Sequence, residues 1–240
     1  MTDRRSIDDP RRRILVRALS LGLLSSFPAG LARAQAFGAP GKLPEGQCIF
    51  RITGDVSVNG KPADLKTVIK AGDTVKTGKG AEVVFVVGTQ AMILRGGTEL
   101  AIETPRDASL FARGMRMLTG ALLSVSRGER MQVRTTTGTI GIRGTGFYVE
   151  AQPDQTYFCT CYGVSEVASV REPEKTESII AQRHDRPVYI LADGTSGGLI
   201  RNAPFINHTD QELALIEALV GREPPFVFPK DSYTAPRRGY

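Results

Sequence analysis

Apolar and β-branched stretches alternate with turn residues along most of the chain after residue 41. Gly, Asn and Asp recur at intervals that leave room for strands but not for long helices. The stretches between them are rich in Val, Ile and Thr, which favour strands. This pattern predicts an all-β fold in the form of a sandwich, a barrel or a solenoid. The expected strands are Cys48–Thr53, Asp55–Val58, Ala81–Val87, Ala91–Leu94, Glu99–Ile102, Ala121–Val125, Met131–Thr135, Thr139–Ile142 and Gly146–Glu150.

The clearest local signal is the pair Asn59-Gly60, which follows the apolar residues Val56 and Val58. Asn and Gly both tolerate the positive φ angles that a type I′ turn requires. The sequence therefore predicts a tight hairpin at this pair.

Helical periodicity appears near the C-terminus, where Thr209 and Glu212 form a capping-box pattern and Gly221 provides a stop. A helix of about three turns is not stable alone. We expect it to dock onto the β domain or, as the alternative, onto a partner. Its apolar stripe consists of Leu213, Ile216, Leu219 and Val220.

These patterns divide the chain into four parts. We expect a signal peptide over residues 1–34, a β domain over residues 41–170, and a β extension with the docking helix over residues 171–222. Residues 223–240 are rich in Pro and read as an extended tail.

The first 34 residues have the order of a secretory signal: a charged start, a weakly apolar run and a small-residue end. Arg11 and Arg12 fit a twin-arginine signal, and an ordinary general-route signal is the alternative. The apolar run from Ala18 to Leu31 is shorter than the roughly 20 residues that a membrane span requires. We therefore expect export to the periplasm without a permanent membrane span.

Net charge and motifs exclude two classes of function. The chain carries a formal charge of +6, but residues 1–34 hold seven Arg and three acidic residues. The remainder has 24 Lys and Arg against 22 Asp and Glu, too even a balance for a nucleic-acid protein. The sequence shows no nucleophile elbow, phosphate loop, zinc-protease helix or dinucleotide fingerprint. We therefore expect that the protein is not an enzyme.

An ordered series of segments resembles the FecR domain family. The resemblance covers about 120 residues, and the ordered series is more specific than any single Gly-rich turn. It implies a FecR-like β-solenoid or a sandwich-like stack of short strands, with one short C-terminal α-helix added here. The segments are AGDTVKTGKGAEVVFVVG (71–88), LRGGTELAIE (94–103), LTGALLSVSRG (118–128) and VRTTTGTIGIRGTGFYV (133–149).

The family signature ends here in Arg143-Gly144-Thr145. Glycines in a strand-like run allow a bend or the close approach of another backbone. Arg143 can donate to carbonyl groups that such a bend exposes. We favour a structural corner over a ligand-contacting Arg143.

The resemblance to the FecR family implies a periplasmic sensor domain, which in that family acts on a sigma factor through a cytoplasmic segment and a membrane helix. Residues 1–34 are too short for that cytoplasmic segment, and the sequence has no second apolar run of membrane-spanning length. Anti-sigma activity is therefore not expected to carry over. The resemblance implies a module for protein recognition or envelope signalling, with an envelope protein as its partner.

Cys159 and Cys161 lie two residues apart in an apparent strand and therefore share one face, which we expect to be its accessible side. With His184 as the third member, they form a candidate site for zinc or copper, or for thiol redox chemistry, in a periplasmic protein. A local disulfide is a further possibility for the pair. The alternative is a Cys pair packed in a strand, with His184 and His208 in surface turns.

Overall fold

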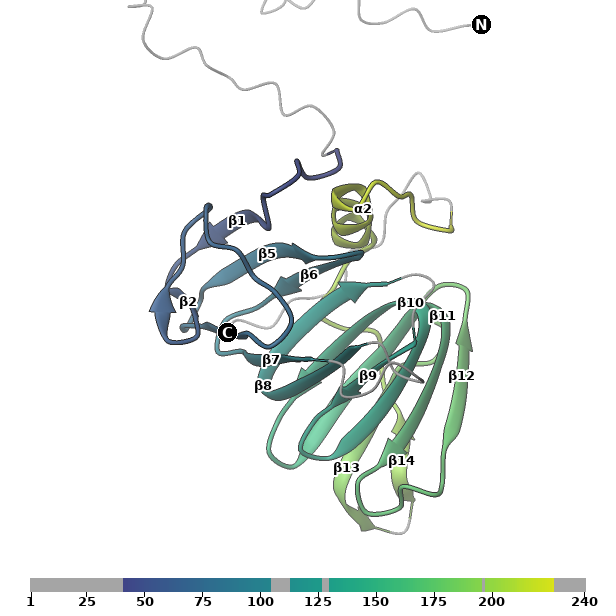
Figure 1. Cartoon of the computed structure of the whole chain (residues 1–240). Coiled ribbons are helices and arrows are strands. Elements are labelled where there is room, and N and C mark those ends of the chain that lie inside the picture. The colour runs from purple at the N-terminus through teal and green to yellow at the C-terminus, as the bar shows by residue number, and fades with distance from the viewer. Residues whose placement is uncertain (1–40, 105–112, 127–129, 196, 227–240) are drawn as a thin grey trace, which may run out of the picture. The chain divides into compact units, whose positions relative to one another are not determined.

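The computed structural model describes residues 41–104, 113–126, 130–195 and 197–226. In these ranges 14 strands form one hydrogen-bonded sheet, and helix α2 (Asp210–Leu219) follows them (Figure 1). The prediction of an all-β fold with one short C-terminal helix is confirmed. The strands are β1 (Ile49–Thr53), β2 (Val56–Val58), β3 (Lys61–Pro62), β4 (Thr74–Thr77), β5 (Glu82–Val87), β6 (Gln90–Leu94), β7 (Glu99–Glu103), β8 (Arg113–Val125), β9 (Arg130–Arg134), β10 (Gly138–Ala151), β11 (Gln155–Ser169), β12 (Glu177–Ala181), β13 (Val188–Thr195) and β14 (Gly198–Asn202).

The sheet runs in the order β14-β13-β11-β10-β9-β8-β7-β4-β2-β3, with β1, β5, β6 and β12 paired off this path. Its described pairs are antiparallel except β8 with β9, which run parallel. The hairpin predicted at Asn59-Gly60 is confirmed, since both residues have positive φ and Val58 pairs with Lys61.

Two strands are longer than the sequence pattern predicts, because glycines expected to mark turns lie inside strands. Gly120 in β8 has a φ of 90°, and a Cβ there would lie 2.4 Å from the Cα of Thr98. The half of β8 before Gly120 pairs with β7 and β9, and the half after it pairs with β6 and β10. Gly120 therefore bends a continuous strand between two sets of neighbours.

The predicted strands Thr139–Ile142 and Gly146–Glu150 form the single strand β10. Between them, Gly144 has a φ of 61°, and the register against β11 shifts between Arg143 and Gly146. An irregularity of this kind is a β-bulge, which bends a strand without ending it.

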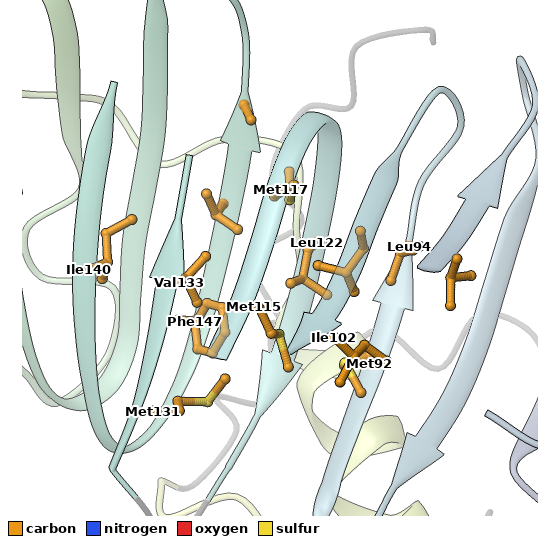
Figure 2. Packing of buried hydrophobic residues seen from close by; sticks show 14 of the residues in the cluster. Met92, Leu94, Ile102, Met115, Met117, Leu122, Met131, Val133, Ile140 and Phe147 are labelled. Carbon is orange, nitrogen blue, oxygen red and sulfur yellow. The ribbon is translucent and has the colours of Figure 1, made fainter. Parts of the chain in front are cut away.

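One face of the sheet buries a cluster of aliphatic, Met and Phe side chains, here called the first core (Figure 2). Because neighbouring residues of a strand point to opposite faces, Leu122 belongs to this core while Leu123 belongs to another. Figure 2 labels Met92, Leu94, Ile102, Met115, Met117, Leu122, Met131, Val133, Ile140 and Phe147 of the first core.

The opposite face carries the second core, which is closed by residues 203–226, here called the C-terminal segment. Its helix α2 packs against β6 and β8. Leu213, Ile216 and Leu219 of the predicted apolar stripe are buried there. The helix therefore docks onto the sheet of its own chain.

Helix α2 begins as predicted. The Glu212 backbone N–H donates to the Thr209 hydroxyl at 3.3 Å, and the Thr209 N–H donates to the Glu212 carboxylate at 3.0 Å. The second Glu212 oxygen accepts from Arg95, at the end of β6, at 2.5 Å. Arg95 also pairs with Glu82, and its side chain is only 6% exposed. One buried guanidinium thus links the helix to the sheet.

Several predictions fall outside the described residues. These are the signal peptide over 1–34 with Arg11 and Arg12, and the tail from residue 227 onward. Within the described ranges, no helix has both the length and the apolar character needed to cross a bilayer.

Candidate functional site

Two cysteines and two histidines meet in the second core. The ligand atoms of Cys159, Cys161, His184 and His208 all lie within 4.8 Å of one another. Cys159, Cys161 and His208 are fully buried, and the side chain of His184 is 7% exposed. The structure thus brings together the three residues singled out in the sequence and adds His208.

Strand β11 supplies both thiols. Phe158 points into the first core, while Cys159 and Cys161 point into the second. The expectation that the two Cys face an accessible side is wrong. The reason is the C-terminal segment, which covers this face with residues distant in sequence from β11.

His184 comes from the loop between β12 and β13. Its backbone N–H donates to the carbonyl of Cys161 at 2.9 Å, which fixes the loop against β11. The Asp185 carboxylate accepts from the backbone N–H groups of Gln182 and Arg183. This turn holds His184 at a φ of 53°, a left-handed conformation that His adopts more readily than most residues.

His208 lies just before α2 and is positioned by its neighbours in the fold. Asn207 has a φ of 61°, and its side chain amide donates to Glu150 of β10. The His208 ring stacks on Tyr148 with their centroids 4.5 Å apart. The alternative interpretation, in which His184 and His208 lie in surface turns, is therefore wrong for both side chains.

The contacts inside the cluster define which ring atoms face one another. The His184 Nδ1 lies 3.5 Å from the Cys159 Sγ and 3.1 Å from the His208 Nε2. On its outer side, His184 Nε2 contacts the Asp210 Oδ1 at 2.9 Å. Arg183 pairs with the other oxygen of Asp210.

The environment shifts the pKa values of the two thiols in opposite directions. Burial raises the pKa of a thiol, yet the pKa of Cys159 lies well below its usual range because Cys161, His208 and His184 stabilise its thiolate. Burial and the hydrogen bond with Cys159 raise the pKa of Cys161 well above its usual range. Burial opposes a charged imidazole, but Cys159 and then Asp210 raise the pKa of His184. The pKa shifts therefore favour one thiolate beside one imidazolium, and a soft metal binds the thiolate together with an imidazole that has lost its proton.

The sequence pattern predicted His184 as the third member of the site and did not predict His208. The usable signal was that the chain has only two histidines, and both lie in this cluster. Asp210 and Arg183 had no such signal, because they act through His184 and are recognised only from contacts across the fold.

The signature Arg143-Gly144-Thr145 lies at the bulge of β10. Arg143 forms an ion pair with Glu166 of β11 at 3.0 Å, and among the described residues it makes no fork to backbone carbonyls. Thr145 is buried, and Gly163 of β11 lies so close that a Cβ there would be 2.7 Å from the Thr145 Cγ2. This arrangement supports the structural-corner interpretation.

Comparison with known proteins gives a family and two structural likenesses. Two crystal structures described as candidate anti-sigma factors from Parabacteroides distasonis resemble the chain. One is 18% identical with a TM-score of 0.44, over 54% of this chain and 58% of that one. The other is 17% identical with a TM-score of 0.45, over 68% of this chain and 82% of that one.

The chain thus spans less than two thirds of the first of these two structures. No curated protein matches the sequence. The model of the family described as FecR protein matches residues 73–164, a region that runs from β4 into β11. Residues 73–164 of this chain are therefore similar to the FecR family.

Proposed function

We propose that this chain is an exported, non-catalytic FecR-type β module that recognises another protein of the cell envelope and thereby takes part in signalling. The observation that carries the proposal is the FecR match over residues 73–164. A near-neutral charge after residue 34 supports a protein partner over a nucleic acid.

The fold limits where recognition takes place in this proposal. The matched region forms the middle of the sheet, and its strands contribute buried side chains to both cores. Exposed apolar side chains lie at its margin, where Val170 follows β11 and Ile180 lies on β12. Ile180 is 75% exposed, and the one described partner of β12 is β11. This margin is the surface on which to test recognition.

The test places a photo-crosslinking amino acid at position 180 or 170 in the native host, with exposed Lys66 as the matched control position. We expect one and the same envelope protein to crosslink from positions 180 and 170 but not from position 66. Its co-purification with the otherwise native chain should fall at least tenfold on Ile180→Asp. Crosslinks that appear equally from all three positions, or none from the envelope fraction, would contradict the proposal.

Export is tested separately through Arg11 and Arg12. Replacing both by Lys should retain the precursor in the cytoplasm, because the twin-arginine route depends on the pair. An unchanged yield of processed protein in the periplasm would assign the chain to the general export route instead.

A further inference from the structure

Each imidazole ring of the cluster turns one nitrogen toward the other ring and one toward an outer partner. His184 Nε2 faces the Asp210 carboxylate at 2.9 Å, and His208 Nδ1 faces the Ile206 carbonyl at 2.7 Å. Both outer partners are acceptors, so each ring carries its proton on that outer nitrogen. When both rings are neutral, the inner nitrogens are unprotonated, and their lone pairs face each other at 3.1 Å and repel. A cation between them removes this repulsion.

The spacing of the four donors suits one tetrahedral ion. For Zn–N bonds near 2.0–2.1 Å and Zn–S bonds near 2.3 Å, tetrahedral edges are about 3.3 Å for N···N, about 3.6 Å for S···N and about 3.8 Å for S···S. The His184 to His208 contact is 3.1 Å and the Cys159 to His184 contact is 3.5 Å. With no ligand pair more than 4.8 Å apart, small side-chain rotations complete the geometry.

Charge balance selects the ion. Two thiolates and two neutral imidazoles around Zn²⁺ give a net charge of zero, which suits a fully buried site. The same donors around Cu⁺ leave one uncompensated negative charge. The nearby carboxylate of Asp210 is already balanced by Arg183. Sulfur and nitrogen donors also disfavour the hard ions Mg²⁺ and Ca²⁺.

We infer that Cys159, Cys161, His184 and His208 bind one structural Zn²⁺ ion, with Asp210 and the Ile206 carbonyl orienting the two rings. A carboxylate or a backbone carbonyl behind each ligating His is the usual outer partner of such sites, and this cluster has one of each. The ion joins β11 of the FecR domain to the C-terminal segment. This inference stands independently of the proposed recognition of an envelope partner.

The test uses the full chain, exported by its native host and purified without chelator. We expect about one zinc per chain by elemental analysis. After removal of zinc, Co²⁺ should give the visible bands of tetrahedral cobalt together with a thiolate-to-cobalt charge-transfer band in the near ultraviolet. Chelator should lower the melting temperature, because binding to the folded state stabilises it.

Matched thiol variants locate the site. The double change Cys159→Ser/Cys161→Ser should lose both the zinc and the charge-transfer band. Cys48→Ser should keep them, because Cys48 is half-buried and contacts the Ile69 carbonyl instead of the cluster. Zinc retained by the double variant would overturn the assignment. Should that variant fail to fold, the cobalt spectrum of the unaltered chain still decides, since no thiolate band means no site.

Two other outcomes would overturn the inference. One is a Cys159–Cys161 disulfide in the intact mass of the exported protein. The other is copper in place of zinc in the elemental analysis of the natively exported protein, which would assign the site to copper.

Asp210 is a positioning residue in this scheme. Asp210→Asn should weaken zinc affinity by about 10–100-fold while leaving the stoichiometry at one. The cobalt spectrum should keep its charge-transfer band, because both thiols remain. An Asn variant with unchanged affinity would show that the carboxylate does not orient His184.

Discussion

The two faces of the sheet are closed in different ways. The first core consists of apolar side chains supplied by the strands and by the loops between them. The second core includes two thiols and several tyrosines, and it is covered by the C-terminal segment. Fully buried His208 and Glu217 belong to that cover. Strand alternation is enough to build the first core, whereas the second also needs specific polar partners from distant parts of the chain.

This difference sets what each core tolerates. A purely apolar core accepts hydrophobic replacements of similar volume. In the second core, Glu217 is held by Tyr162 and by Arg222, whose Nε lies 2.6 Å from the carboxylate. Removing one partner of such a buried group leaves the other without compensation.

The largest expected effect is in the first core. Phe147 is fully buried, and its ring centroid lies 6.1 Å from that of Phe158. Phe147→Ala should lower the free energy of unfolding by about 3–5 kcal/mol, because it leaves a cavity as well as removing apolar contact. Denaturant unfolding measures this. Phe147→Leu is the control and should cost less than about 1.5 kcal/mol. Equal losses for Phe147→Ala and Phe147→Leu would show that the volume of the side chain at position 147 does not determine the stability.

The second core is tested at α2, where Leu213 is fully buried. Leu213→Ala should cost about 2–5 kcal/mol. Hydrogen exchange should show greater loss of protection in α2 than in β9, which lines the first core alone. Ile180→Ala, at an exposed position, should stay within about 0.5 kcal/mol. An unchanged melting temperature for Leu213→Ala would show that the helix contributes nothing to holding the sheet.

Sequence patterns predicted the parts of the structure that depend on near neighbours. The hairpin at Asn59-Gly60 and the cap at Thr209 were found because turn geometry and capping involve residues at most three apart. The predicted strand ends were wrong where Ala121–Val125 is part of β8 and where Thr139–Ile142 and Gly146–Glu150 join in β10, since a glycine with positive φ bends a strand as readily as it ends one.

Only part of the candidate site could be predicted from the sequence pattern. Spacing showed that Cys159 and Cys161 share a face, because alternation is local. It did not show which face, nor that His184 and His208 arrive there. Their arrival depends on the pairing of β11 with β12 and on the docking of α2, both of which are long-range contacts.

The corner at the family signature should show a smaller effect than either core. Gly163 has a φ of 91°, and a Cβ there would lie 2.7 Å from the Thr145 Cγ2. Gly163→Ala should cost about 2 kcal/mol, from the left-handed backbone and from the displaced Thr145. Gly60→Ala is the matched control, since Gly60 has a φ of 76° but open space around it. Gly60→Ala should cost about 1 kcal/mol. Equal losses for Gly163→Ala and Gly60→Ala would show that contact with Thr145 adds nothing to the cost.

The smallest expected effect is at the cap of α2. Thr209 lies between His208 and Asp210, and its hydroxyl accepts from the Glu212 N–H at 3.3 Å. Thr209→Ala leaves that donor without its partner and should cost about 1 kcal/mol in thermal or denaturant unfolding. Thr209→Ser keeps an oxygen at the same place and should recover most of the loss. Because the cap belongs to the second core alone, hydrogen exchange should increase in the first turn of α2 and stay unchanged in β9. Equal losses for Ala and Ser would show that packing of the Thr209 methyl group, and not the cap, fixes the start of the helix.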